Sequence, residues 1–339
     1  MEYRRLGNTG TAVSTLCMGA MTFGQESDEK VSHAQLDRFV ERGGNFIDTA
    51  DVYSQGVSEE IIGRWFAARP GVRDQVVLAT KGRFPMGDGP NDHGLSRTHL
   101  TRALDASLRR LGVEAIDLYQ AHAWDPITPL EETLRFYDDA VRAGKIRYAG
   151  VSNFIGWQLQ KAATITELRG LTPIVTLQPQ YNLITRDIEF ELVDVCQNEG
   201  IGILPWSPLA GGWLTGKYRR DEVPTGTSRL GEDPDRGMEA YAPRNAQERT
   251  WRIVDTVRQV AEERGVSMAQ VALAWVADRP AVTSVILGAR TLEQLDDNLG
   301  AADLHLSERE TALLDEAGAP AVADYPYGGP GVSQRSRRF

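Results

Sequence analysis

Residues 45–53 read NFIDTADVY, an apolar run that ends in groups able to handle protons. Two further apolar runs end in the same way, ATKG at residues 79–82 and LYQAH at residues 118–122. Each run predicts a β-strand that is followed by a functional side chain. The polar residues at these three strand ends are Asp48, Tyr53, Lys81 and His122. If the strands are parallel neighbours, their C-terminal ends meet and the four groups converge at one place.

These four residue types suit one reaction, the protonation of an oxygen that gains electrons. A free phenol, with a pKa of about 10, is a poor acid at neutral pH. The ammonium of Lys81 would lower the pKa of Tyr53, and Asp48 would keep Lys81 charged and in place. As a neutral imidazole, His122 would donate a hydrogen bond to a carbonyl oxygen and orient it towards Tyr53. We therefore expect a site that protonates an alkoxide.

Strand and helix patterns alternate along the chain and predict an α/β fold, a (β/α)₈ TIM barrel. A doubly wound sheet would use the same units, but eight βα units can be counted and no G-x-G-x-x-G follows the first strand. Before that strand, residues 3–6 and 12–14 flank GNTG and predict a β-hairpin. The eight strand candidates are Thr15–Met18, Asn45–Ala50, Val76–Thr80, Ile116–Gln120, Tyr148–Ser152, Val175–Gln178, Gly202–Trp206 and Ser284–Leu287.

Capping signals predict where several helices begin. Ser32 with Gln35, Thr128 with Glu131, and Thr291 with Gln294 each have the spacing of a capping box. The first of these helices would run to Arg42 before two glycines. Leucines at residues 100, 104, 108 and 111 predict another amphipathic helix.

Composition limits the class of protein. The chain has 339 residues and a net charge of −10, which argues against nonspecific binding to nucleic acid because phosphate contacts need a basic face. The N-terminus has no apolar signal core and no run is long enough to span a membrane, so we expect a cytoplasmic protein. Its two cysteines, Cys17 and Cys196, are far apart in sequence and are expected to be reduced. One well-placed imidazole is too few for a metal site, so no metal is expected.

The order Asp48, Tyr53, Lys81 and His122 resembles the catalytic tetrad of the aldo-keto reductases, and FIDTADVY is a specific string of that family. The resemblance extends over GVSNF at residue 150, LQPQYNL at 177, WSPLAGG at 206 and VILGARTLEQLDDNL at 285. It implies a barrel closed at the bottom by the hairpin. It also implies transfer of a hydride from NADPH to the carbonyl of an aldehyde, ketone or keto sugar, with Tyr53 as general acid. His122 at the fourth position implies carbonyl reduction rather than reduction of a steroid double bond.

The same resemblance implies the cofactor contacts. Amide and hydroxyl groups after two strands would hold the nicotinamide carboxamide, Trp206 would stack on the ring, and a loop after it would cover the pyrophosphate. The expected contacts are Gly19, Met21, Asp48, Ser152, Asn153, Gln178, Trp206, Ser207, Leu209, Gly211, Gly288, Arg290, Gln294 and Asn298.

One local argument for a phosphate is independent of the resemblance. Arg290 next to the N-terminus of the helix that starts at Thr291 is electrostatically unfavourable unless an anion arrives. By resemblance, that anion is the 2′-phosphate of NADPH. By contrast, residues 211–217 nearly spell a phosphate-binding P-loop, but Tyr218 stands where Ser or Thr is required, so a nucleotide hydrolase is not expected.

We expect residues 1–318 to form one barrel, and residues 319–339 to be a tail that is either a lid over the substrate or disordered. The loop 215–243 is similarly long and irregular. The expected partner is a small carbonyl compound, and oligomeric state cannot be inferred from the sequence. Two other functions remain open: a redox-sensing regulatory subunit that binds cofactor and turns over slowly, and a barrel that merely binds a sugar or phosphate.

Overall fold

The structure is a computed structural model that describes residues 1–335. Its central sheet has eight parallel strands in the order β10-β3-β4-β5-β6-β7-β8-β9. Neighbours in sequence are therefore neighbours in space, as in a barrel and unlike a doubly wound sheet. These eight strands are β3 (Leu16–Gly19), β4 (Phe46–Asp48), β5 (Val77–Gly82), β6 (Ile116–Ala121), β7 (Ile146–Ser152), β8 (Ile174–Gln178), β9 (Gly202–Ile203) and β10 (Val285–Leu287).

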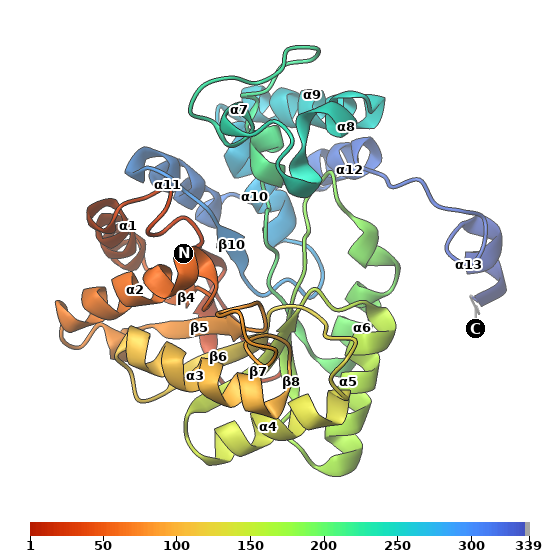
Figure 1. Ribbon diagram of the computed structural model, residues 1–339. Helices are drawn as coiled ribbons and strands as arrows, with labels where there is room; N and C mark the ends of the chain where they lie inside the picture. Colours follow the sequence, from red (N-terminus) through yellow and green to blue (C-terminus); the bar gives the residue numbers. More distant parts are fainter. Residues whose placement is uncertain (336–339) are drawn as a thin grey trace.

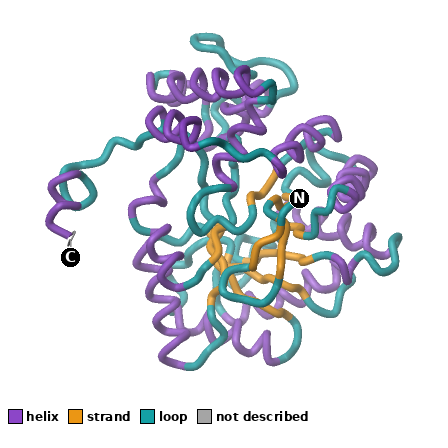
Figure 2. Tube along the Cα trace, turned by 180° about the vertical axis from the view of Figure 1, so that it is seen from behind, coloured by secondary structure: helices purple, strands orange, loops and turns teal. Residues whose placement is uncertain are grey.

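Backbone hydrogen bonds also join β9 to β10 and the residues just before it, which are the two edges of this strand order, and so close the barrel. The Ile203 N–H donates to Ala281 O at 2.8 Å, the Thr283 N–H to Ile203 O at 2.9 Å, and the Ile286 N–H to Pro205 O at 3.0 Å. Figure 2 shows the strands at the centre of the molecule with helices around them. The predicted (β/α)₈ barrel is thus confirmed, and each predicted strand overlaps an observed one.

The predicted hairpin lies at the N-terminal ends of the barrel strands. Strand β1 (Tyr3–Arg5) pairs antiparallel with β2 (Ala12–Ser14). From this hairpin Leu6 and Val13 join a buried cluster with residues near the strand starts, among them Phe46 and Val175. The hairpin therefore covers the bottom of the barrel, and the polar strand ends lie at the opposite end.

Helices cover the outside of the barrel (Figure 1). The helices of the barrel are α1 (Glu29–Glu41), α2 (Val57–Ala67), α3 (Arg97–Leu111), α4 (Leu130–Arg142), α5 (Gly156–Arg169), α6 (Leu192–Glu199), α9 (Glu248–Arg264), α10 (Met268–Ala277), α11 (Leu292–Leu299) and α12 (Glu308–Ala317). Among the described residues, no helix combines the length and the apolar character needed to cross a membrane.

None of the three predicted capping boxes forms in full. At α11 Thr291 accepts from the Gln294 N–H, but the Gln294 side chain accepts from the Arg290 N–H, and the other two boxes are wrong. Helix α1 begins earlier than expected, because Asp28 is its N-cap and accepts from the Val31 N–H, whereas Ser32 lies inside and its hydroxyl donates to Asp28 O. Thr128 does not cap α4; its hydroxyl donates to Asp125 instead. Several Ser, Thr and Asp side chains near a helix start can each cap it, and their spacing in the sequence does not determine which one does.

The two long irregular segments contain short helices. Residues 215–243 include α7 (Arg229–Glu232) and lead into α8 (Tyr241–Asn245), and they lie at the top of Figure 1. After α12 an extended stretch leads to α13 (Gly329–Arg335), which stands apart from the barrel. In this tail the Tyr327 ring stacks on Phe190, with centroids 5.2 Å apart, and its hydroxyl donates to Glu191. The division at residue 318 and the role of the tail stay predictions, and residues 336–339 of the tail lie outside the described residues.

Candidate active site

The ends of three adjacent strands bring the four predicted proton-handling groups together. Asp48 ends β4, Lys81 is the penultimate residue of β5, and His122 follows β6 directly. Tyr53 opens a short 3₁₀ turn that follows the loop after β4. Because the strands are parallel neighbours, all four residues lie at the C-terminal end of the barrel.

Lys81 is the centre of the hydrogen-bond network. Its side chain is fully buried, and its Nζ donates to Asp48 Oδ2 at 2.5 Å, to Thr49 O at 2.7 Å and to Tyr53 Oη at 3.4 Å. Burial alone would lower the pKa of Lys81, but the charge of Asp48 and the contact with Tyr53 outweigh it and raise the pKa. The lysine is therefore held as an ammonium next to the phenol.

Two amides fix the carboxylate of Asp48. Its Oδ1 accepts from Gln178 Nε2 at 2.9 Å and from Gln120 Nε2 at 3.2 Å. Gln120 was not among the predicted site residues. Its position in β6 opposite Lys81 in β5 is the signal that could have found it, since side chains at paired positions of neighbouring strands lie close together.

The direction of the pKa shift at Tyr53 differs from our expectation. Burial raises the pKa of Tyr53, and the nearby Lys81 lowers it only in part. Lys81 does lower the pKa of Tyr53, as expected, but the expectation left out the cost of burying a phenolate, which is larger. The phenol is held in its protonated form, which is the form that can donate a proton.

His122 is neutral, as expected. Burial and then the positive charges of Lys81 and Arg83 hold its pKa well below the ordinary value. Its ring meets Tyr53 edge to face with centroids 5.7 Å apart, and Phe84 at 4.7 Å. A neutral imidazole next to the phenol can donate one hydrogen bond to an oxygen that both groups reach.

Polar groups from the next strands form a connected set beside the proton-handling groups. Ser152 Oγ donates to Gln178 O at 2.7 Å, and Asn153 Nδ2 donates to His122 O at 3.0 Å. Trp206 Nε1 donates to Asn153 Oδ1 at 3.1 Å. The predicted residues of this region therefore lie together at one end of the barrel. The side-chain oxygen of Gln178 takes no part in these hydrogen bonds.

The glycines near the site have different surroundings. A side chain at Gly19 would place its Cβ 2.7 Å from Leu287 O, so this glycine is required by the close approach of β3 and β10 rather than by a ligand. A side chain at Gly288 would meet nothing within 4 Å. Gly211 has φ +65°, a backbone conformation that favours glycine. In the same segment after Trp206, Ser207 Oγ donates to Glu239 at 2.8 Å. Leu209 packs partly against the core, and Met21 is exposed.

Helix α11 begins as expected, but Arg290 beside it is already paired with carboxylates. Thr291 caps the helix by accepting from the Gln294 N–H, and Asn298 Nδ2 donates to Gly288 O at 3.3 Å. Arg290 forms ion pairs with Glu26 and with Glu232 of α7, each at 3.0 Å. The inference that this arginine is unfavourable without an outside anion is therefore wrong, because its partners come from segments distant in sequence.

Two further cations near Arg290 were missed by the sequence analysis. Partial burial and repulsion from Arg290 and Arg229 lower the pKa of Lys217. The pKa of Arg229 is also lowered, mainly by burial, and its Nε is buried without a hydrogen-bond partner in the described part of the chain. Mutual repulsion and an unpartnered donor are features of a site that can receive an anion. Lys217 closes the stretch 211–217 that nearly spells a P-loop, but no motif marks Arg229 or brings the two residues together.

Asp51 is a buried carboxyl group behind the site. It is fully buried, and neither carboxylate oxygen has a well-formed hydrogen bond within residues 1–335. Burial and the neighbouring carboxylate of Glu59 raise its pKa to about 7, against the opposing charges of Arg110 and Lys81. Its own N–H donates to Lys81 O at 3.1 Å. The folded protein holds this proton more tightly than the unfolded chain does. Asp51 should therefore lower the free energy of unfolding as the pH rises from about 4 to about 7.

Replacing Asp51 by Asn is therefore expected to stabilise the protein in a pH-dependent way. The free energy of unfolding should rise by up to about 4 kcal/mol at pH 8 and change little at pH 4. The reason is that at pH 8 the wild type buries an ionised carboxylate at this position, whereas asparagine stays neutral. Urea unfolding of both proteins at the two pH values measures this difference. Asp74→Asn, at an exposed position, is the control and should have no such dependence. An equal effect of Asp51→Asn at both pH values would contradict the assignment.

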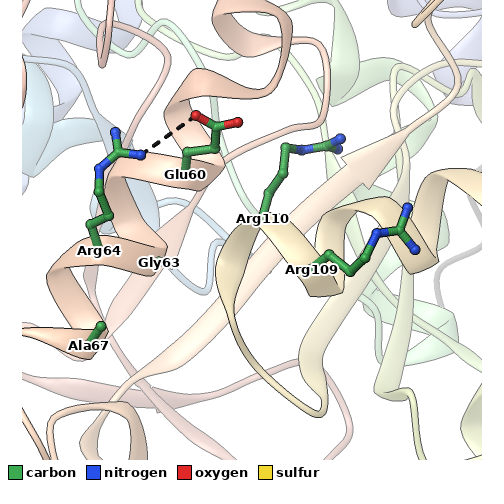
Figure 3. Close-up of a pocket in the computed structure, with 6 residues that line it drawn as sticks. All are labelled: Glu60, Gly63, Arg64, Ala67, Arg109 and Arg110. Carbon is green, nitrogen blue, oxygen red and sulfur yellow. Dashed lines mark ion pairs between the residues drawn. The ribbon is translucent and has the colours of Figure 1, made fainter.

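A surface pocket of about 350 Å³ lies between α2 and α3 (Figure 3). Glu60 and Arg64 of α2 form an ion pair at 3.6 Å on one side, and Arg109 and Arg110 of α3 lie on the other. None of the predicted site residues lines it. The predicted site therefore lies at the strand ends and not in this pocket.

Comparison with known proteins shows which family the chain resembles. The model of the aldo/keto reductase family matches residues 15–319. An uncharacterized oxidoreductase, YrpG, of Bacillus subtilis is 39% identical over 324 residues, which cover 93% of this chain and 95% of the relative. A probable voltage-gated potassium channel subunit beta of Arabidopsis thaliana is 38% identical, over 90% of this chain and 92% of the relative. Versiconal hemiacetal acetate reductase of Aspergillus parasiticus is 34% identical, over 94% and 98%.

Proposed function

Because the chain belongs to the aldo/keto reductase family of oxidoreductases, we propose that it reduces the carbonyl group of an aldehyde, ketone or keto sugar to an alcohol with NADPH. One observation carries the proposal: a buried ammonium, Lys81, joins the carboxylate of Asp48 to the phenol of Tyr53, with the neutral His122 beside it. When bound, the cofactor supplies the hydride. The residues of the chain manage the charge that develops on the carbonyl oxygen.

Each residue has a separate part in that task. Tyr53 gives its proton to the oxygen, and the ammonium of Lys81 stabilises the tyrosinate that remains. Asp48, held by Gln120 and Gln178, keeps Lys81 charged. His122 donates a hydrogen bond that orients the carbonyl. The raised pKa of Tyr53 fits a proton donor that stays protonated until charge develops next to it.

The residues at the strand ends fit the nicotinamide end of the cofactor. The unused side-chain oxygen of Gln178, with Ser152 and Asn153, supplies polar groups for a carboxamide, and Trp206 supplies a planar surface. The unpartnered Arg229 Nε and the cation Lys217 fit phosphate oxygens. Gly19, Met21, Ser207, Leu209 and Gly211 complete the proposed contacts.

Preference for NADPH over NADH would depend on Arg290 with Gly288, Gln294 and Asn298. Since Glu26 and Glu232 already pair with Arg290, a 2′-phosphate would have to displace or share these carboxylates. We therefore propose that the two acids weaken NADPH binding, and that the preference is set by this competition.

Replacing Arg290 by Ala should weaken NADPH binding by roughly tenfold or more and NADH binding much less, because a charge-assisted contact with the extra phosphate is lost. Glu232→Gln should act in the opposite direction and tighten NADPH, since it removes a competing anion. Fluorescence titrations with both cofactors measure these effects. Arg64→Ala, which removes an arginine paired with Glu29 on the surface, is the control. Equal losses for NADPH and NADH in the Arg290 variant would remove the 2′-phosphate from the proposal.

Product analysis tests the reaction itself. Incubation with NADPH and 4-nitrobenzaldehyde should yield 4-nitrobenzyl alcohol in an amount equal to the NADPH oxidised. A different product, or oxidation of NADPH without alcohol, would contradict carbonyl reduction.

Similarity to the potassium channel subunit favours a second candidate function. In it, the chain binds the cofactor, turns over slowly and regulates a protein partner. The two candidates predict the same binding but different steady-state rates, so fast turnover on simple aldehydes would exclude the second.

A further inference from the structure

A cation that pairs with no carboxylate of residues 1–335 lies next to the proposed proton-transfer groups. Arg83 follows β5, two residues after Lys81. Its Nη2 donates to Trp124 O at 3.2 Å, and its guanidinium lies 4.9 Å from the centre of the Phe84 ring. Its Nε is buried and has no hydrogen-bond partner, and no carboxylate pairs with the guanidinium anywhere in the described part of the chain. Nη1 is not among the buried atoms and donates to no atom of residues 1–335, so it is left for another oxygen ligand.

The same phenylalanine places this cation beside the catalytic imidazole. The Phe84 ring centre is 4.7 Å from that of His122 and 4.9 Å from the Arg83 guanidinium. The guanidinium and the imidazole therefore lie no farther apart than the sum of these two distances. A benzene ring with substituents at opposite ends can reach both groups. The charge of Arg83 also acts on His122, where it contributes to the low pKa of the imidazole.

An apolar and largely aromatic surface adjoins the pair. Trp124 meets Phe154 edge to face with centroids 5.1 Å apart, and Trp157 at 5.4 Å. Trp157 and Ile155 are each 54% exposed, and Ile127 is 87% exposed. These residues lie in or just after the loops that follow β6 and β7, at the same end of the barrel as His122. Exposed apolar side chains grouped beside a functional site indicate a ligand surface.

We propose that Arg83 binds a carboxylate of the substrate, so that the preferred substrates are aldehydes or ketones with an aromatic or other apolar body and an anionic group. This inference rests on the proposed function as a carbonyl reductase. An arginine that is partly desolvated and lacks a counter-charge forms strong, oriented hydrogen bonds with a carboxylate. With the carboxylate at Arg83 and the body against Trp124, the carbonyl would face Tyr53 and His122.

The test compares two substrates that differ only in charge, 4-carboxybenzaldehyde and its methyl ester. In the wild type, kcat/KM should favour the carboxylate by roughly tenfold or more. Replacing Arg83 by Met should lower kcat/KM for the carboxylate at least tenfold more than for the ester, and Arg83→Lys should restore part of the preference. Arg102→Met, which removes an exposed arginine that donates to Asn91 O near the same loop, is the control and should leave the ratio of the two substrates unchanged.

The outcomes separate this inference from the proposed function. Equal losses for acid and ester in the Arg83 variant, or no preference in the wild type, would overturn the inference while reduction of the ester keeps the reductase assignment. If neither compound is reduced, calorimetric binding of terephthalate to the protein with NADP⁺ decides the matter without turnover. Binding that is lost in Arg83→Met would support the carboxylate site, and binding unchanged by the variant would overturn it.

Discussion

Replacing Tyr53 by Phe is expected to lower the rate of carbonyl reduction by about 10²–10⁴-fold, the usual contribution of a general acid. The affinity for NADPH should change little, because only a hydroxyl is removed and its bond with Lys81 is long, at 3.4 Å. Single-turnover kinetics with a bound cofactor measure the chemical step, and a fluorescence titration measures binding.

Tyr137→Phe is the matched control for this variant. Its hydroxyl is also buried, and it has no hydrogen-bond partner within residues 1–335, but it belongs to α4 outside the site. The control should keep both activity and cofactor affinity. If Tyr53→Phe retained most of the rate, or if it lost NADPH binding instead, the role given to Tyr53 would be wrong.

The second large effect concerns the buried ion pair of Lys81 and Asp48. Asp48→Asn should abolish reduction and lower the free energy of unfolding by about 3–5 kcal/mol, because an ammonium stays buried without its counter-charge. In the double variant Asp48→Asn/Lys81→Met both charges are gone, so the loss of stability should be smaller than in Asp48→Asn alone, although activity stays absent.

Urea unfolding of wild type, both single variants and the double variant completes this cycle. The control pair is Arg135 and Glu131 on the surface of α4, where Arg135→Met should cost no more than about 1 kcal/mol. Strictly additive losses at Asp48 and Lys81 would mean that the two charges do not stabilise each other, and the proposed means of holding Lys81 charged would fail.

Local sequence predicted the barrel and the convergence of its strand ends. Strands such as those that lead to Asp48 and Lys81 are recognised from short apolar runs. The order of the parallel strands then determines which strand ends meet. The hairpin was equally local, since GNTG lies between its two strands.

Most of the features that were wrong or missed depend on contacts between distant segments or on burial, and one depends on a local competition between caps. Glu26 and Glu232 reach Arg290 from positions far along the chain, and no local pattern marks that meeting. The pKa of Tyr53 depends on how deeply the folded chain buries the phenol, which the sequence does not specify. The start of α1 at Asp28 depended on a competition between nearby caps that differ little in energy.

The measurement that tests the central claim most directly is a fluorescence titration of the purified protein with NADPH and with NADH, followed by addition of 4-nitrobenzaldehyde while the absorbance of the reduced nicotinamide is recorded. The account predicts tight binding of NADPH and its rapid oxidation by the wild type, with almost no oxidation by Tyr53→Phe. Tight binding with almost no oxidation by the wild type would contradict the reductase and favour a redox-sensing subunit.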